Sequence, residues 1–182
     1  MSLFQPLRDF FHRREARSMI EGAGRVHLVN RRQESPRDKF VFPGIDYLDD
    51  IEVDGQRVGY VDYGINPLLD RVYINKIDIA PAHQLQGIGL GVLWHLWLTH
   101  QVPIVPISQY GTSGGFWSLA RRRFAAAGAL IEPELRLCEL DDAKQRWQHL
   151  VPEPEDKRAI REYWEWVASE HAAGRPAGPG VR

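Results

Sequence analysis

The sequence predicts an α/β (α+β) fold, in which a mixed, mostly antiparallel central sheet is flanked by helices and followed by an extra C-terminal helix. Three observations predict it. Residues 71–98 have the pattern of a strand, a tight loop and a helix, Asp54-Gly55 is a strong β-hairpin signal, and apolar residues recur at helical spacing near the C-terminus. With 182 residues, 43% of them hydrophobic, the chain can bury a sizeable core.

We expect three segments along the chain. Residues 1–150 form the domain, residues 151–173 an amphipathic helix, and residues 174–182 a disordered tail. The domain includes an N-terminal helix with a stripe of Leu3, Leu7, Phe10 and Phe11, and the C-terminal helix carries Ile160, Tyr163, Trp164, Val167 and His171 along one side. Because so apolar a face aggregates when free, we expect it to pack on the domain or on a second copy in a homodimer.

Within the domain, the expected elements follow the chain in order. They are strands at 25–30, 47–53, 56–63, 72–80, 104–107 and 135–140, a polar loop at 31–44, and helices from Gly89 through Trp97 and over 116–127. In the strand at 72–80, strict alternation places Tyr73, Asn75, Ile77 and Ile79 on one face, with Asp78 opposite Tyr73. Pro81 ends this strand because it has no amide proton to donate.

The loop that follows the strand at 72–80 is a candidate anion site. At a helix N-terminus, unpaired backbone amides and the positive end of the helix dipole converge, which suits a phosphate. Gly87 and Gly89 leave room for a phosphate to approach the backbone. The loop is not a P-loop, because no Lys occurs between Lys76 and Lys144, and Val92 replaces the third glycine of a dinucleotide fingerprint.

The run Gln84-Leu85-Gln86-Gly87-Ile88-Gly89, preceded by Ile77-Asp78-Ile79, resembles the acyl-CoA loop of the GNAT superfamily of N-acetyltransferases. That family's pattern is Arg/Gln-x-x-Gly-x-Gly/Ala after a strand that ends in a hydrophobic-x-hydrophobic run. The resemblance implies that amides from Gln84 to Gly89 hold the CoA pyrophosphate, while Ile77, Asp78 and Ile79 pair their backbone with the pantetheine arm. It also implies acetyl-CoA as the co-substrate.

The helix at 116–127 departs from the family pattern. The family helix carries Asn-x-x-Ala-x-x-x-Tyr, with a glycine four residues later. Counting back from Gly128 puts Phe124 at the tyrosine, Trp117 at the asparagine and Ala120 at the alanine. A phenylalanine cannot donate the proton that the family tyrosine gives to the departing CoA thiolate.

The acceptor side departs as well. Pro36 and Pro43 interrupt the loop at 31–44, which is too short for the helical pair that forms the family's acceptor wall, so the N-terminal helix replaces that wall or the site is open. The hairpin is acidic, with Asp46, Asp49, Asp50, Glu52, Asp54 and Asp62 against Arg57 alone. Such a rim favours a cationic amine as acceptor, or is simply a solvated hairpin face.

A base must take a proton from an ammonium acceptor. By placement, the candidate catalytic residues are Tyr110, Ser118 and Tyr73, together with Ser113 in the same loop as Tyr110. Each of them also suits a purely structural role.

The sequence therefore predicts an acyltransferase, a cytoplasmic N-acetyltransferase that moves an acetyl group from acetyl-CoA to a primary amine of a small molecule or protein. One alternative is a toxin-type acetyltransferase acting on aminoacyl-tRNA, with a basic channel of Arg31, Arg32, Arg37 and Lys39. Another is a non-catalytic GNAT-fold module that binds CoA or a partner, which Phe124 and Trp117 favour. Otherwise, a net charge of -1 disfavours binding to nucleic acid. The single cysteine, Cys138, and the spacing of the histidines predict that the protein binds no metal. The apolar runs are too short for a membrane span, so none is expected.

Overall fold

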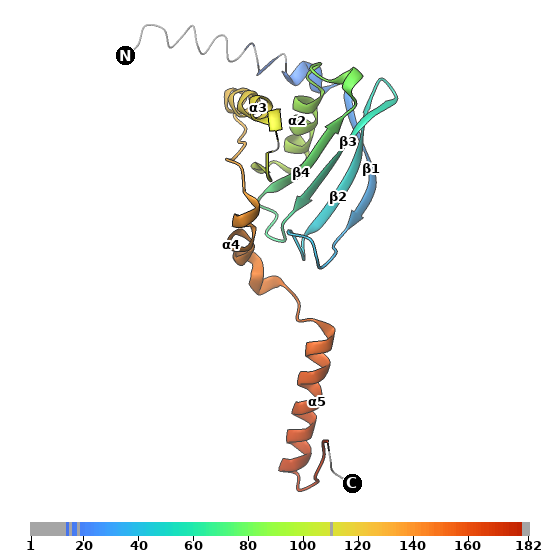
Figure 1. Cartoon of the computed structure of the whole chain (residues 1–182), viewed down its shortest axis with the longest axis vertical. Coiled ribbons are helices and arrows are strands. Elements are labelled where there is room, and N and C mark those ends of the chain that lie inside the picture. Colours follow the sequence, from blue (N-terminus) through green and yellow to red (C-terminus); the bar gives the residue numbers. More distant parts are fainter. Residues whose placement is uncertain (1–13, 15, 18, 110, 180–182) are drawn as a thin grey trace, which may run out of the picture. The chain divides into compact units, whose positions relative to one another are not determined.

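The structure, a computed structural model, describes residues 14, 16–17, 19–109 and 111–179 of the chain. The chain divides into two compact units, Met1–Leu150 and Val151–Arg182 (Figure 1). The apolar stripe expected between Leu3 and Phe11 lies outside the described residues, as does Tyr110.

The first unit is built on a five-stranded sheet in the order β1-β2-β3-β4-β5 (Figure 1). Its strands are β1 (Val26–Glu34), β2 (Ile45–Val53), β3 (Gln56–Ile65), β4 (Val72–Ile79) and β5 (Ile104–Pro106). The first four pair antiparallel and β5 joins β4 in parallel, so the predicted mixed, mostly antiparallel sheet is confirmed. Asp54 and Gly55, with φ angles of 52° and 77°, form the predicted turn between β2 and β3.

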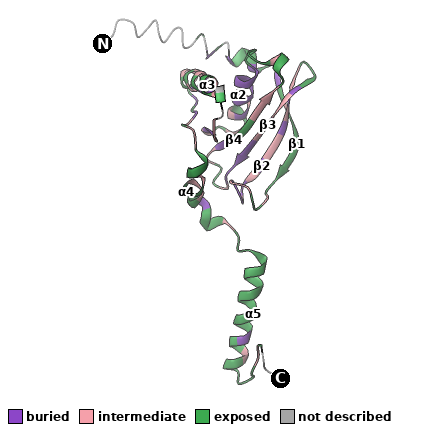
Figure 2. Cartoon of the chain, viewed as in Figure 1, coloured by how far each residue is buried: buried purple, intermediate pink, exposed green. Residues whose placement is uncertain are grey.

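Helix α2 (Ile88–His100) covers one face of the sheet and supplies much of the main core. It begins one residue before the predicted Gly89, and Gly87 caps it with a φ of 78°. Figure 2 shows buried residues concentrated in α2 and in the strands. Helix α3 (Gly114–Ala126) and the helical residues between 14 and 23 complete this core with Trp117, Ala120, Phe124, Met19 and Ala23.

A β-bulge at Asn75 changes which side chains of β4 share a face. The pairing of β4 with β3 skips this residue, and a bulge moves the following side chains to the opposite face. The strict alternation predicted for this strand is therefore wrong: Ile77 and Ile79 pack against the main core, on the opposite face from Tyr73. Asp78 accordingly shares the face of Tyr73 instead of lying opposite it.

The face of the sheet opposite α2 carries a second, smaller core. The segment between β1 and β2 forms turns, which place Phe40 against Tyr73. The fully buried Trp147, in η4 (Gln145–Leu150), joins this cluster and donates from Nε1 to the carbonyl of Phe42 over 3.1 Å. Turns and a short helix thus cover this face where a helical pair could not be accommodated.

The strand predicted at 135–140 is wrong. This part of the chain makes only isolated bridges near β5, and then forms η3 (Leu137–Glu139) and α4 (Leu140–Lys144). The reason is a local helix-start signal, since the Glu139 carboxylate accepts the backbone N–H of Arg136 over 2.9 Å. Asp141 and Asp142 then favour the first turn of α4.

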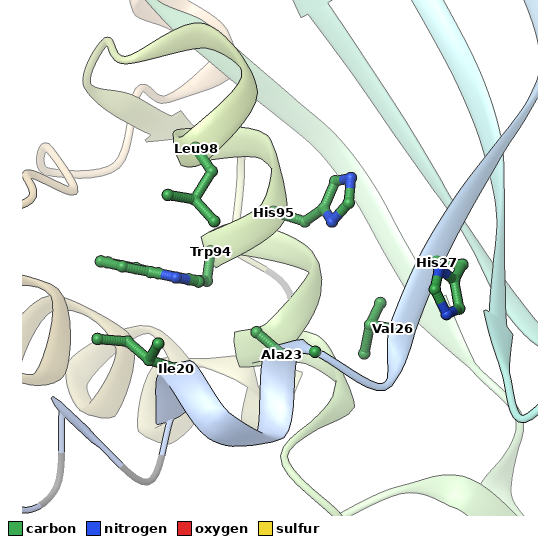
Figure 3. A pocket seen from close by; sticks show the side chains of 8 residues that line it. Ile20, Ala23, Val26, His27, Trp94, His95 and Leu98 are labelled. Carbon is green, nitrogen blue, oxygen red and sulfur yellow. The ribbon is translucent and has the colours of Figure 1, made fainter.

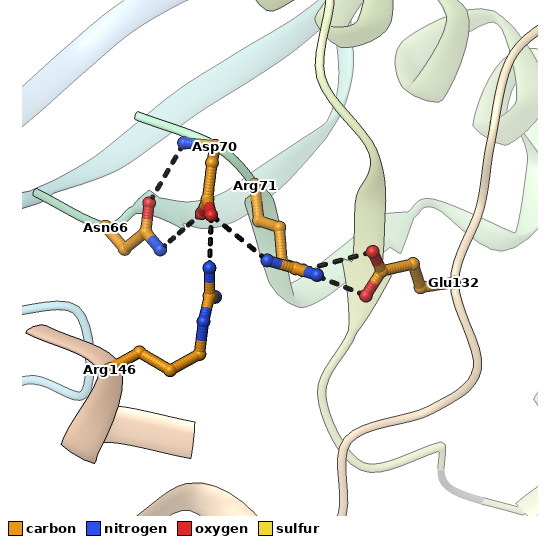
Figure 4. Close-up of polar contacts among 5 residues, drawn as sticks. All are labelled: Asn66, Asp70, Arg71, Glu132 and Arg146. Carbon is orange, nitrogen blue, oxygen red and sulfur yellow. Dashed lines mark hydrogen bonds and ion pairs between the residues drawn. The ribbon is translucent and has the colours of Figure 1, made fainter. Parts of the chain in front are cut away.

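A polar network fixes the connection between β3 and β4 to the segments that follow α3 (Figure 4). Asp70 accepts hydrogen bonds from Asn66 Nδ2 at 2.7 Å, from Arg71 Nη1 at 3.1 Å, and from Arg146. Arg71 Nε in turn donates to both carboxylate oxygens of Glu132, at 2.9 and 3.1 Å. Although burial opposes it, these hydrogen bonds hold the pKa of Asp70 below its usual value.

The second unit consists of α5 (Glu155–Ala172) and a short returning tail. Val167 is 5% exposed, and the tail packs beside it at Gly178. The ring of His171 lies 2.7 Å from the carbonyl of Ala177, and Arg175 Nε donates to Glu170 over 2.6 Å. No helix among the described residues is long and apolar enough to cross a membrane.

Candidate functional site

Strand β4 loses its neighbour partway along. β5 pairs only with residues 72–74 of β4, and the chain beyond β5 turns instead toward Leu135, whose carbonyl accepts the N–H of Ser108 over 3.1 Å. Among the described residues, no strand replaces β5 beside residues 75–79. This side of residues 75–79, called the open edge below, lies directly before the loop at 84–89.

Backbone groups of Ile77 and Ile79 face the open edge. The N–H of Ala80 donates to the carbonyl of Val58 in β3 over 2.8 Å, so Ala80 and the residues two and four positions before it direct their backbone groups toward β3. Ile77 and Ile79 direct theirs the other way. The carbonyl of Ile79 is engaged, because Gln84 Nε2 donates to it over 2.8 Å. The carbonyl of Ile77 and both N–H groups therefore remain to pair with an extended ligand.

The loop at 84–89 presents its backbone at the N-terminus of α2. It follows η1 (Pro81–His83), and Leu85 and Gly87 adopt positive φ angles of 60° and 78°. The residues from 84 to 87 are exposed, and Gln86 Nε2 braces the loop by donating to the carbonyl of Ala82 over 3.1 Å. The first amides of a helix have no acceptor within the helix, so this end suits an anion. Of the predicted cofactor-binding residues, Ile77, Ile79 and the loop at 84–89 thus lie together beside the open edge. The prediction that Asp78 also pairs its backbone there is wrong, because its backbone groups are directed toward β3.

The two glycines of this loop have different roles. A Cβ at Gly89 would lie 3.0 Å from Cε2 of Phe116 on α3, so any larger residue there would require the Phe116 ring to shift by a few tenths of an ångström. At Gly87 an added Cβ would meet nothing within 4 Å, and only the positive φ favours glycine. Gly87 is therefore the glycine that leaves the loop backbone accessible.

Three polar side chains from three strands meet on the sheet face opposite α2. Asn75 Nδ2 donates to Asp62 Oδ1 over 2.8 Å and lies 3.5 Å from Asp46 Oδ1. Asp46 is only 4% exposed, and its Oδ2 has no hydrogen-bond partner among the described residues. Burial raises the pKa of Asp46 to about 6, against the opposing charges of Lys39 and Arg32 and with the help of Asp62. We call Asp46 and Asp62 the carboxylate pair.

The carboxylate pair lies where the open edge begins. Asn75, which contacts both carboxylates, directly follows Ile74, the last residue of β4 that pairs with β5. An extended ligand bound along the open edge from the loop at 84–89 would bring its far end to this point. Sequence reasoning identified the acids of the hairpin but missed this pair.

Arginines neutralise part of the acidic rim that the hairpin was predicted to form. These ion pairs join Asp50 to Arg57 at 2.6 Å and to Arg31 at 3.5 Å, and Asp54 to Arg25 at 2.7 Å. Asp49 accepts hydrogen bonds from Asn30 and Tyr63. Asp46, Asp62 and Glu52 make no ion pair with a described residue, and of these Asp46 and Asp62 lie beside Asn75 at the open edge.

Two of the residues predicted as bases, Tyr73 and Ser118, make no hydrogen bond to the carboxylate pair. Tyr73 is 2% exposed, and its ring meets that of Phe40 edge-on, with centroids 5.0 Å apart. Burial raises the pKa of Tyr73, which keeps its hydroxyl protonated. Ser118 is exposed on α3, and Tyr110 lies outside the described residues.

The residues that replace the family's tyrosine and asparagine are core residues. Phe124 is 0% exposed and packs edge-on against Trp94, with ring centroids 5.5 Å apart, and Trp117 is buried in the same cluster. Neither presents a polar group to the open edge. α3 therefore contributes packing at these two positions, and its contact with the loop is made by Phe116.

A separate apolar pocket of about 230 Å³ lies between α2, β1 and the helical residues before them (Figure 3). It is lined by Ile20, Ala23, Gly24, Val26, His27, Trp94, His95 and Leu98. None of these residues was predicted to bind a ligand. In the part of the chain that the structure describes, no three His, Cys, Asp or Glu side chains group as a metal site requires.

No protein-family model matches this chain, and no curated protein matches it either. Its chemistry is therefore inferred from the open edge, the loop at 84–89 and the carboxylate pair.

Proposed function

We propose that the protein is a cytosolic N-acetyltransferase of the GNAT type, which transfers the acetyl group of acetyl-CoA to a primary amine of a small molecule or protein. One observation carries the proposal: the open edge of β4 leads directly into the exposed, amide-rich loop at the N-terminus of α2. An acyl-CoA combines the two chemical parts that such a site suits, an extended arm with amide groups and a pyrophosphate.

In this proposal, two sets of backbone groups bind the two parts of the substrate. The N–H groups of Ile77 and Ile79 and the carbonyl of Ile77 suit the amides of the pantetheine arm, which would add to the sheet as a strand does. The first amides of α2 and the loop suit the pyrophosphate. An arm that runs from the loop along the open edge brings its acyl end to Asn75.

At the acyl end, the chain holds the groups that transfer to an amine requires. Acetyl-CoA supplies an activated thioester, so the protein has to hold the amine in line with it and to accept the amine's proton. The carboxylate pair provides negative charge for a cationic acceptor at this position. Phe124 offers no proton to the leaving thiolate, but a thiolate whose pKa is ~8.5 leaves adequately without one.

A module that binds CoA or a protein partner without catalysis is the second candidate. The observation that favours it is the full burial of Phe124, which leaves α3 without the family's acid at that position. An enzyme acting on aminoacyl-tRNA is less well supported. Two arginines of its basic channel are engaged, Arg31 with Asp50 at 3.5 Å and Arg32 with Glu34 at 3.1 Å.

Calorimetry with acetyl-CoA tests the binding half of the proposal. We expect the full chain to bind acetyl-CoA, and Gly87→Val to weaken binding by about tenfold, because a left-handed backbone costs an L-residue ~1–2 kcal/mol. Gly55→Val is the matched control, since Gly55 has a φ of 77° and equally open surroundings but lies in the β2–β3 turn. Wild-type protein that binds no acetyl-CoA would contradict the enzyme and the CoA-binding module alike.

A turnover assay separates the two candidates. Release of the CoA thiol is followed with a thiol-reactive dye over a panel of amines, with enzyme alone as the baseline because Cys138 is exposed. We expect acetylated product, identified by mass, from at least one primary amine. Tight binding with no transfer to any amine would instead support the non-catalytic module.

A further inference from the structure

We propose that Asp46 and Asp62 act as one proton-accepting pair for the acceptor amine, with Asp62 contacting the ammonium group and Asp46 as its buried partner. The inference rests on the proposed acetyl transfer, and it defines the acceptor class as amines that arrive protonated. Sequence reasoning had placed the base on Tyr110, Ser118 or Tyr73.

The geometry supports a shared role for the two carboxylates. One amide nitrogen, Asn75 Nδ2, lies 2.8 Å from Asp62 Oδ1 and 3.5 Å from Asp46 Oδ1. Asp46 is 4% exposed, and its Oδ2 is a buried acceptor without a partner among the described residues. A buried carboxylate oxygen without a donor favours the protonated form of Asp46. An ammonium group carries three donors, and Asp62, which is less buried than Asp46, is the carboxylate that it can reach.

The charges that face the pair come from the segment before β2 and from β1, β3 and β4. On β4, Lys76 lies opposite Asp62, and its ammonium group is paired with Asp78 at 2.8 Å. Lys39 from the segment before β2 and Arg32 from β1 favour the charged form of Asp46, whereas burial and Asp62 from β3 favour its protonated form. The charge of Asp62 thus adds to burial in favouring a proton on Asp46. With its pKa at about 6, Asp46 is largely deprotonated near neutral pH and can accept a proton.

The transfer step balances with these groups. The ammonium gives one proton to the carboxylate pair, and the nitrogen lone pair then forms the N–C bond to the acetyl carbon. The C–S bond breaks, and the CoA thiolate leaves with its electron pair. The nitrogen loses its second proton to the departing thiolate or to water, which leaves the neutral amide. The pair afterwards releases its proton to water.

Two variants and two acceptors test this role. The acceptors are 1,4-diaminobutane, which is protonated at neutral pH, and methoxyamine, a weakly basic amine that is unprotonated across the same range. Asp62→Asn should lower kcat/KM for the diamine by about 100-fold at neutral pH, and change it little for methoxyamine, which has no proton to lose before attack. Asp50→Asn is the control: it removes an equal charge from β2, but from a carboxylate paired with Arg57 at 2.6 Å, and should leave both rates unchanged.

The pH profile separates this role from a structural one. In the wild type, kcat/KM for the diamine should fall on the acid side near the pKa of about 6, and the methoxyamine rate should not. Asp46→Asn should remove this fall near pH 6, because the amide has no proton to take up there. Thermal unfolding and acetyl-CoA affinity show whether each variant is folded. If a variant does not fold, the two wild-type pH profiles still distinguish a proton-accepting role from a structural one.

Three outcomes overturn the inference. Variants that slow both acceptors equally, or a wild-type acid limb that is the same for both acceptors, would make the pair structural while leaving acetyl transfer in place. No transfer by the wild type to any amine would overturn the proposed function, and this inference with it.

Discussion

The burial of Asp46 lowers the stability of the folded chain at neutral pH. Burial raises its pKa from 3.8 to about 6, so the native chain holds this proton more tightly than the unfolded chain does. The unfolding free energy therefore falls as pH rises between these two values, and stays lower above them. Over this pH range, the unfolding free energy falls by at most about 3 kcal/mol. Retaining such a carboxylate is understandable if the chemistry needs it.

Asp46→Asn should therefore stabilise the chain at neutral pH. The amide cannot ionise, so the expected gain is about 1–3 kcal/mol near pH 7 and close to zero below the ordinary pKa of an aspartate. Urea unfolding at both pH values measures it. Asp50→Asn, which removes a carboxylate held by Arg57 at 2.6 Å, should give no such gain. A loss of stability in Asp46→Asn near pH 7 would mean that the ionised carboxylate is favourably held.

A substitution of Phe124 provides a second test at a single residue. Its side chain is 0% exposed in the main core, so the hydroxyl of Phe124→Tyr would be buried beside Trp94 without a partner. We expect a loss of about 1–3 kcal/mol in unfolding free energy, and no gain in acetyl transfer. Phe116→Tyr, at a partly exposed position of the same helix, should cost less. A faster release of CoA by Phe124→Tyr would show that this position faces the thioester.

Among the elements, those with strong local signals could be predicted and those that depend on distant partners could not. The turn at Asp54-Gly55 and the start of α2 after Gly87 follow from residues within a few positions of each other. The strand expected at 135–140 alternates as a strand should, but the local interaction of Glu139 with the chain before it favours a helical turn. Asp141 and Asp142, which follow Glu139, were the sequence signal for the start of a helix.

The carboxylate pair shows why only part of the candidate site was predictable. Near the turn, Glu52 of β2 lies opposite Arg57 of β3. If this register continued unchanged, Asp46 would lie opposite Tyr63, on the other face of the sheet from Asp62. A bulge in β3 shifts the register by one residue, so Asp46 shares a face with Asp62. The loop at 84–89 is contiguous in sequence and was predicted, whereas the pair depends on a bulge that no local motif marks.

The open edge of β4 makes a prediction about amide exchange. The N–H groups of Ile77 and Ile79 face away from β3, whereas that of Ala80 donates to Val58 over 2.8 Å. In the free protein, the amides of Ile77 and Ile79 should exchange with solvent at least about tenfold faster than that of Ala80. Saturating acetyl-CoA should slow both, because the pantetheine arm would pair with them. Hydrogen exchange followed by NMR measures each amide separately, and amides that acetyl-CoA leaves unprotected would place the arm elsewhere.

At the level of the whole molecule, the apolar side of α5 is a feature that the proposed chemistry does not use. The predicted stripe is exposed at Ile160, Tyr163 and Trp164, at 58%, 41% and 53%, while Val167 is covered by the returning tail. Exposed apolar area of this kind is stabilised by burial at roughly 25 cal/mol per Å². A second copy of the chain offers an identical stripe, which is the symmetric solution that most soluble oligomers use.

Light scattering on the full chain tests this homodimer. We expect a mass twice the 20.9 kDa of one chain, and a return to the single-chain mass in Trp164→Glu, since a charge buried at an apolar interface is strongly unfavourable. Ser169→Glu adds the same charge at an exposed position of α5 off the stripe and should leave the dimer intact. Acetyl-CoA affinity should be equal in all three proteins, because the loop at 84–89 and the open edge belong to the first unit. A wild-type mass of one chain would exclude the homodimer without affecting the acetyltransferase proposal, whereas a loss of acetyl-CoA binding in Trp164→Glu alone would show that the site depends on the second copy.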